Sequence, residues 1–222
     1  MKKISAIICA LTLALTLCAS ALAEHVAVAI SDDTGALVFC EPALEVSDVN
    51  GDGSLTIYDA LYAAHELGFS GGAAAGLDAA DSGYGLSLTK LWGVDNGGSY
   101  GYYLNDKTAM SLDDAVAEGD YLRAYAYTDL VNWSDTYACF DRASIEVAAG
   151  EAIHLTLTSV DWSANSAPIA GAEILVNGEA SGVLTDAEGT AEIVLEQSGS
   201  YVISARSSAL TMVAPVCFAS VK

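Results

Sequence analysis

Twelve consecutive residues, 48–59, include oxygen-bearing side chains at regularly alternating positions. Asp48, Asn50 and Asp52 alternate through the first half of this segment, and Asp59 occupies the twelfth position. Calcium takes about six to eight hard oxygen ligands, and EF-hand loops of this length supply them from alternating positions and a final carboxylate. We therefore predict that residues 48–59 form an EF-hand-like loop with Ca²⁺ as its cofactor.

The other positions of the loop fit the same chemistry. Gly53 stands at the sixth position, where the sharp bend favours a residue without a side chain. Ser54 would contribute its carbonyl oxygen, Thr56 would contribute a hydroxyl or a bound water, and Leu55 would face the core. The predicted metal ligands are Asp48, Asn50, Asp52, Ser54, Thr56 and Asp59.

The alternative interpretation of this segment is an Asp- and Gly-rich turn without a metal. Asp59 is shorter than the glutamate usual at the twelfth position, so it must bring the helix closer or bind through one oxygen. We predict a structural role, in which calcium fixes the start of the following helix to the preceding strand.

Two strands and a helix must position this loop. Alternating side chains predict a strand at 26–30 and a return strand at 36–40 that continues at 43–46. Apolar and aromatic residues at helical spacing predict a helix over 57–67, with Gly68 as its stop.

The rest of the chain indicates mainly β-structure. Residues 70–83 show no periodicity and predict a loose connection, and strand patterns resume at 86–91, 100–104 and 121–127. Beyond residue 143, regular alternation between turn residues is typical of a β-sandwich. Its six strands are expected at 144–147, 153–158, 172–176, 191–195, 201–205 and 216–221. We predict a mostly β protein with one main helix (α+β) and a domain boundary near residue 143.

The loop and the helix behind it, residues 48–67, resemble one half of a dockerin repeat. Dockerins use two such repeats, and this chain has no second copy. The resemblance implies calcium binding, whereas the missing copy argues against cohesin as a partner. Dockerin-like protein docking therefore stays an alternative function.

The wider stretch resembles bacterial β-grasp domains related to the C-terminal domain of transcobalamin. The segments 84–93, 98–105, 111–114 and 118–121 carry this likeness, including the run Gly-Tyr-Tyr-Leu-Asn within 101–105. The resemblance implies a β-grasp domain over residues 24–143. It also makes extracellular capture of a corrinoid, or of another small ligand, an alternative function.

Residues 144–222 resemble bacterial Ig-like surface modules. The segments 167–172, 185–189 and 198–201 carry that likeness. The resemblance implies an Ig-like β-sandwich and indicates fold rather than activity.

The N-terminal residues 1–23 have the pattern of a bacterial signal peptide. Lys2 and Lys3 precede an uncharged apolar run over 4–17, and small residues at 21 and 23 form a cleavage site. We predict a secreted, extracellular protein without membrane insertion after cleavage. Its net charge of −21 disfavours nucleic acid and anionic lipid as partners.

No constellation of residues predicts catalysis, so we expect no enzyme. Ser70 lies in a G-x-S-x-G match, but a helix precedes it where a hydrolase elbow needs a strand. The three histidines lack metal-like spacing, and His65 is predicted to be a core or boundary residue. The three cysteines beyond residue 24 are predicted to be buried strand residues: Cys40, Cys139 and Cys217.

Aromatic residues are the remaining candidates for ligand binding. The group could stack on a sugar or a corrinoid ring, although packing is the commoner use of aromatic residues on strands. Its members are Trp92, Tyr100, Tyr102, Tyr103, Tyr125, Tyr127 and Trp133. We predict a secreted calcium-binding, non-enzymatic binding or adhesion module whose partner is an unknown protein, glycan or small molecule.

Overall fold

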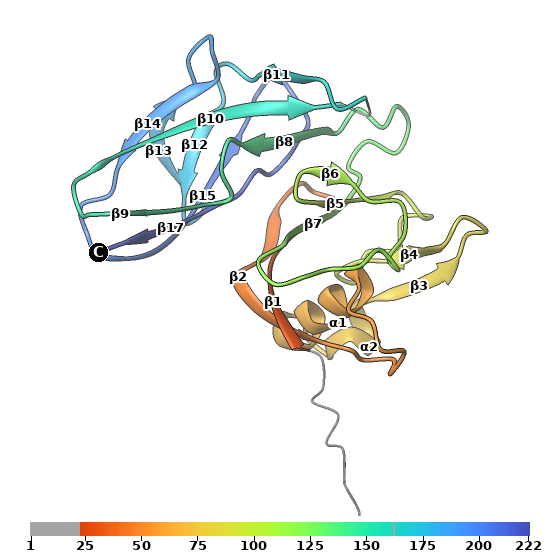
Figure 1. Cartoon of the computed structure of the whole chain (residues 1–222). Coiled ribbons are helices and arrows are strands. Elements are labelled where there is room, and N and C mark those ends of the chain that lie inside the picture. Colours follow the sequence, from red (N-terminus) through yellow and green to blue (C-terminus); the bar gives the residue numbers. More distant parts are fainter. Residues whose placement is uncertain (1–22, 162) are drawn as a thin grey trace, which may run out of the picture.

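The computed structural model describes residues 23–161 and 163–222, which form two lobes (Figure 1). The predicted signal peptide, residues 1–23, lies outside this description except for Ala23. The structure is mostly β with one main helix, so the predicted fold class is confirmed. No helix in the described parts of the chain is both long and apolar enough to span a membrane.

The first lobe is built on a mixed five-stranded sheet. Its strands follow the order β2-β1-β7-β5-β6, in which β1 and β7 run parallel and the other neighbours are antiparallel. The first two strands form an antiparallel hairpin, and β1 also lies beside β7 and parallel to it. These strands are β1 (Ala23–Ser31), β2 (Leu37–Ser47), β5 (Tyr100–Leu104), β6 (Lys107–Thr108) and β7 (Tyr121–Ala126).

Helix α1 (Ile57–Gly68) packs on this sheet beside β2 (Figure 1). Ile57, Leu61 and Ala64 recur at helical spacing and are fully buried, so one apolar face of the helix meets Val26, Val28 and other sheet residues in one core. The hydrophobic effect of this burial orders the segment that follows the predicted calcium loop.

The segment predicted as a loose connection contains regular structure. A short helix, α2 (Gly72–Gly76), is followed by β3 (Asp78–Asp81), which pairs with β4 (Leu86–Lys90). Ala73 and Leu77 are buried in the core of the first lobe. The prediction of a loose loop was wrong, because small alanine side chains anchor the segment without a visible periodicity.

The second lobe is a sandwich of two sheets around its own apolar core. One sheet has the order β13-β12-β15-β17-β9, and the other has the order β11-β10-β8-β16 with β14 beside β10. Ile153, Leu155, Ile174 and Ile203 are buried between them. The strands are β8 (Thr136–Phe140), β9 (Ser144–Val147), β10 (Ala152–Val160), β11 (Ser166–Pro168), β12 (Glu173–Val176), β13 (Glu179–Leu184), β14 (Thr190–Val194), β15 (Gly199–Arg206), β16 (Met212–Val213) and β17 (Cys217–Val221).

Strand pairing changes earlier in the chain than the predicted boundary near residue 143. Strand β8 pairs with β10 and β16 of the sandwich, although it precedes that boundary. The change of sheet therefore falls between Ala126 and Thr136. Ala138 and Phe140 of β8 complete the core of the second lobe, which is the physical reason for this assignment.

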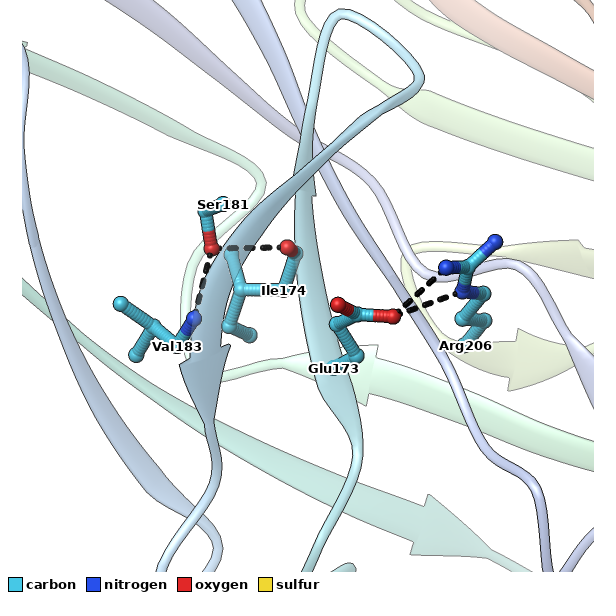
Figure 2. Close-up of polar contacts among 5 residues, drawn as sticks. All are labelled: Glu173, Ile174, Ser181, Val183 and Arg206. Carbon is cyan, nitrogen blue, oxygen red and sulfur yellow. Dashed lines mark hydrogen bonds and ion pairs between the residues drawn. The ribbon is translucent and has the colours of Figure 1, made fainter.

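A bulge in the sandwich shows how side chains replace missing ladder bonds (Figure 2). The register of β12 and β13 shifts between Glu173 and Leu175, so Ile174 has no partner residue on β13. The Ser181 hydroxyl donates to the carbonyl of Ile174 at 2.8 Å and accepts from the amide of Val183. Gly182 permits the bulge with φ of 78°, a conformation that glycine adopts readily.

Charge pairing on the other side of β12 is also visible in Figure 2. Arg206 of β15 donates from Nε and Nη2 to one carboxylate oxygen of Glu173, at 2.9 and 2.7 Å. The two residues are direct partners across the strands. This is a stabilising cross-strand pair on the surface of the sandwich.

The two lobes pack through the face of the first sheet opposite α1. Tyr103, Tyr125 and Tyr127 meet Tyr137 and Val213 of the second lobe in one buried cluster. Strand β7 is consequently buried along its whole length. The sheet of the first lobe thus has α1 on one face and the sandwich on the other.

Arg123 lies at the centre of this contact and is 2% exposed. Its guanidinium donates to the carbonyls of Ala138, Val213 and Ala214 in the second lobe and lies 4.4 Å from the ring centre of Tyr137. A buried charge must be hydrogen-bonded to be tolerated, and these carbonyls meet that need. Arg123 therefore ties the two lobes together.

Candidate metal centre

The loop over residues 48–59 folds around the carboxylate of Asp48. Its Oδ1 accepts the amides of Gly51 and Asp52, at 2.7 and 3.3 Å, and its Oδ2 accepts the amide of Gly53 at 2.8 Å. These hydrogen bonds lower the pKa of Asp48 below its ordinary value, and the bond from the Gly53 amide has the largest effect. Asp48 is therefore an anion at neutral pH and draws the chain into a tight turn.

The middle of the loop continues this pattern of side chains turned toward the backbone. Asp52 accepts the amide of Ser54 at 2.8 Å through Oδ1 and the Asn50 side-chain amide at 2.9 Å through Oδ2. Asn50 in turn accepts the amide of Asp52 at 3.0 Å. Gly53 has φ of 86°, a conformation that favours glycine, as expected for the sharp bend at the sixth position.

Asp59 closes the loop from the first turn of α1. Its Oδ1 accepts the amide of Val49 at 3.0 Å, and its Oδ2 accepts the amide and the hydroxyl of Thr56 at 2.8 and 2.7 Å. Thr56 is the N-cap of α1, and the pair forms a capping box. Asp59 is completely buried, so the first and last turns of the loop are joined by one carboxylate.

The end of the loop is also tied to the rest of the first lobe. Leu55 is buried in the core, as predicted for the eighth position. The carbonyl of Leu55 accepts the amide of Val116, and the amides of Ile57 and Tyr58 are bound by carbonyls of the segment 112–114. The loop is held at both ends, by β2 and by α1.

The predicted ligands thus share one loop, but they are not gathered as a coordination shell. Within the described residues, no three Asp, Glu, His or Cys side chains stand close enough to hold a metal ion. The donor set is chemically suited to calcium, because every predicted contact is an oxygen. Binding would require Asp59, and the Asn50 amide, to exchange hydrogen bonds within the loop for the ion.

The predicted aromatic group is divided between two faces of the first sheet. Tyr102 packs in the core under α1, with Tyr100 and Trp92 against it. Tyr103 lies on the other face and stacks on Tyr137, with ring centres 3.6 Å apart. Trp133 is exposed in a separate loop. The group does not form one stacking platform, because neighbouring positions on a strand point to opposite faces.

His65 is a core residue of α1, as predicted. Its Nδ1 lies 2.6 Å from the carbonyl of Leu61, and its Nε2 accepts the amide of Trp92 at 3.0 Å. The ring is therefore neutral with the proton on Nδ1, and burial lowers its pKa. Sequence reasoning missed this link from α1 to the turn after β4, because Trp92 is distant in the chain.

The other candidates lie in surroundings without catalytic features. Ser70 is exposed in the turn between α1 and α2, so no strand leads into it as a hydrolase elbow requires. Cys40, Cys139 and Cys217 lie on strands as free thiols, and burial raises the pKa of Cys40 and of Cys217 to about 12. These thiols are protonated at neutral pH and so are poor nucleophiles.

Comparison with known proteins yields a distant likeness only. No protein family and no curated protein sequence matches this chain. Solved structures that resemble it include the N-terminal four Ig domains of Dscam1 isoform 9.44, with 18% identity and a TM-score of 0.24 over 47% of this chain and 24% of that chain. The corresponding structure of isoform 4.44 has 18% identity and a TM-score of 0.25 over the same shares.

A third structure, described as the structural basis for Dscam isoform specificity, shares 18% identity at a TM-score of 0.26. It is matched over 56% of this chain and 37% of its own length. This chain therefore spans well under half of the proteins it resembles. These values describe a distant similarity to Ig-like domains and say nothing of activity.

Proposed function

We propose that this chain is an exported, non-enzymatic binding protein whose first lobe is stabilised by calcium at residues 48–59. The observation that carries the calcium proposal is the position of Asp59. This carboxylate joins the first turn of the loop to the N-terminus of α1 through Val49 and Thr56. An ion held by the same loop would replace these hydrogen bonds with coordination by the Asp59 carboxylate and would join the same two parts of the chain.

The energetic scale suits a structural rather than a signalling ion. Calcium sites in extracellular modules have dissociation constants of about 0.1–1 mM. Calcium near 1 mM would therefore add about 1 kcal/mol to the free energy of unfolding. That amount supports the loop without controlling whether the protein folds.

A calorimetric titration tests this proposal on the chain from Glu24 to Lys222. We expect calcium to release or absorb heat and to raise the melting temperature of the EDTA-treated protein. Asp48→Asn keeps the shape of the side chain and should abolish both effects. Asp129→Asn is the matched control, because Asp129 also accepts backbone amides in a tight loop. No heat in the wild type, or equal behaviour of Asp48→Asn and the wild type, would refute calcium binding.

Export and a binding role rest on the sequence patterns. The signal-peptide pattern, the acidic charge of −21 and the resemblances to β-grasp and Ig-like surface modules support an extracellular binding protein. N-terminal sequencing of the exported chain should find Glu24 first. An unprocessed chain retained in the cell would contradict this part of the proposal.

The corrinoid and dockerin alternatives find less support. The tyrosines of the predicted platform are divided between the core of the first lobe and the contact between lobes. The described loop is a single copy embedded between β2 and α1. A cobalamin titration followed by absorbance discriminates the first alternative, since a saturable spectral change would reinstate it.

A further inference from the structure

The outer edge of β2 borders a groove that the functions proposed above do not use. The groove lies between β2 and α1 and has a volume of about 510 Å³. Leu44, Tyr62, Ala63 and Leu67 give it an apolar floor and wall. Leu67 is 64% exposed, which is high for a leucine on a helix that packs against a sheet. A hydrophobic surface beside an open strand suits an extended peptide.

The backbone of β2 is free to pair on this side. Strand β2 stands at the end of its sheet, and among the described strands it pairs only with β1 (Figure 1). Pro42 removes one donor, and the register with β1 shifts beside it. The segment from Ala43 to Ser47 lies beyond this interruption, and alternate residues of it direct their amides and carbonyls away from β1. An added strand would therefore pair along residues 43–47.

The charge around the groove identifies the partner. Glu41 and Glu45 line it from β2, and Glu66 lines it from α1. Among residues 23–161 and 163–222, no basic residue lines it, and the chain as a whole carries a net charge of −21. Two copies of β2 placed side by side would bring these glutamates together, and like charges on adjacent strands are destabilising. The same charges that oppose pairing between copies attract a cationic segment.

We propose that the groove between β2 and α1 binds an extended, basic peptide segment of a partner protein, which adds as a strand along Ala43–Ser47. Alternate side chains of the segment would be apolar and pack against Leu44 and Leu67. The others would be lysine or arginine on the face of Glu45, and Glu41 would attract the segment from the end of the groove beyond Pro42. Main-chain hydrogen bonds supply affinity in this mode, and the alternating side chains supply specificity.

The groove adjoins the predicted calcium loop. Ser47 and Val49 line it, and Asp48 stands between them. This inference rests on the proposed binding function but not on the calcium site. The two claims can fail separately, because none of the predicted calcium ligands lines the groove.

The test uses a short acetylated peptide that alternates lysine and valine, titrated into residues 24–222 by calorimetry. We expect saturable binding that weakens with added salt. The double variant Glu41→Gln/Glu45→Gln should weaken binding about fivefold, since each exposed charge contact contributes modestly. A peptide that alternates glutamate and valine should not bind.

Two controls separate strand addition from general attraction to an acidic protein. The lysine–valine peptide methylated on its backbone nitrogens loses its donors and should not bind. The variant Glu179→Gln/Glu188→Gln removes the same charge from exposed positions of the second lobe and should bind like the wild type. Equal weakening by both double variants, or binding of the methylated peptide, would overturn the proposal.

The remaining outcomes are also decisive. Absence of binding by the lysine–valine peptide, in a protein that still responds to calcium, refutes the groove and leaves the calcium site standing. Peptide binding by a protein that shows no calcium response refutes the calcium site and leaves the groove standing. Concentration-dependent dimerisation that is lost in Leu67→Asp would show that a second copy occupies the groove and would also overturn the proposal.

Discussion

Two acidic loops of this protein are built alike, yet only one is proposed to bind calcium. In the loop at 48–59, the Asp48 carboxylate accepts hydrogen bonds from three backbone amides. In the loop at 128–135, Asp129 gathers the amides of Val131 and Asn132, each at 3.0 Å, and the hydroxyl of Ser134 at 2.7 Å. Hydrogen bonds within each loop lower the pKa of its first aspartate.

The difference lies in what the remaining positions carry. The first loop continues with Asn50 and Asp52, whose oxygens alternate along the chain. The second continues with Leu130, Val131 and Trp133, which are all exposed. A carboxylate that accepts backbone amides is therefore a common feature of turns and does not by itself indicate a metal. Additional oxygen-bearing side chains at alternating positions are what indicate a calcium site.

Each loop is closed by a second carboxylate, and replacing it with alanine tests how burial changes its contribution to stability. We expect these substitutions to have the largest effect on the free energy of unfolding. Asp59 and Asp135 each accept two backbone amides and one threonine hydroxyl. Asp59 is fully buried, whereas Asp135 is partly exposed. We expect Asp59→Ala to lower the free energy of unfolding by about 3 kcal/mol, through the lost cap and the unpaired buried donors.

Asp135→Ala should cost about 1 kcal/mol, because water can replace the lost acceptor. Urea denaturation in EDTA measures both values without a contribution from calcium. Equal losses in the two variants would show that burial does not distinguish the loops.

Calcium should act on one loop and not on the other. We expect saturating calcium to raise the melting temperature of the wild type by about 2–4 °C. Asp129→Asn should keep this increment, and Asp52→Asn should lose it, because Asp52 supplies one of the alternating oxygens. Differential scanning calorimetry with calcium or EDTA measures the increment. Its survival in Asp52→Asn would place any bound ion elsewhere.

The first loop also shows where sequence reasoning reaches its limit. The spacing of Thr56 and Asp59 fits a capping box and the ninth and twelfth positions of a calcium loop equally well. The pattern predicts an acidic loop entering a helix at Ile57, and this is confirmed. Which donors the Asp59 carboxylate meets depends on how closely β2 approaches α1, which local spacing does not encode.

The contact between the lobes could not be predicted from the sequence as well as the first loop could. Tyr102 and Tyr103 alternate as strand residues should, but the pattern does not reveal that the sandwich covers the second face of the sheet. Arg123 was missed for the same reason. Its acceptors on Ala138, Val213 and Ala214 come from distant parts of the chain. The sequence did not predict which sheet contains β8, because tertiary packing decides that it pairs with β10 and β16.

A third site, His65, should lose stability at a higher pH than the two loops do. We expect this to be the smallest of the predicted effects. His65 is buried and neutral, and its pKa is lowered by burial, so the unfolded chain binds a proton more readily than the folded one. The stability that His65 confers is complete above its unfolded pKa of about 6.5 and declines as the pH falls below it. His65→Gln should flatten this decline below about pH 6.5.

The two loops should respond only at lower pH. The lowered pKa values of Asp48 and Asp129 give stability that is present above about pH 4 and lost as the pH falls toward their folded values. Asp48→Asn and Asp129→Asn should therefore leave the decline due to His65 unchanged and reduce the loss below about pH 4. Urea midpoints across this range measure both windows. If Asp48→Asn changed the slope near pH 6, the loop and the helix core would be coupled, and the separation of the two sites would fail.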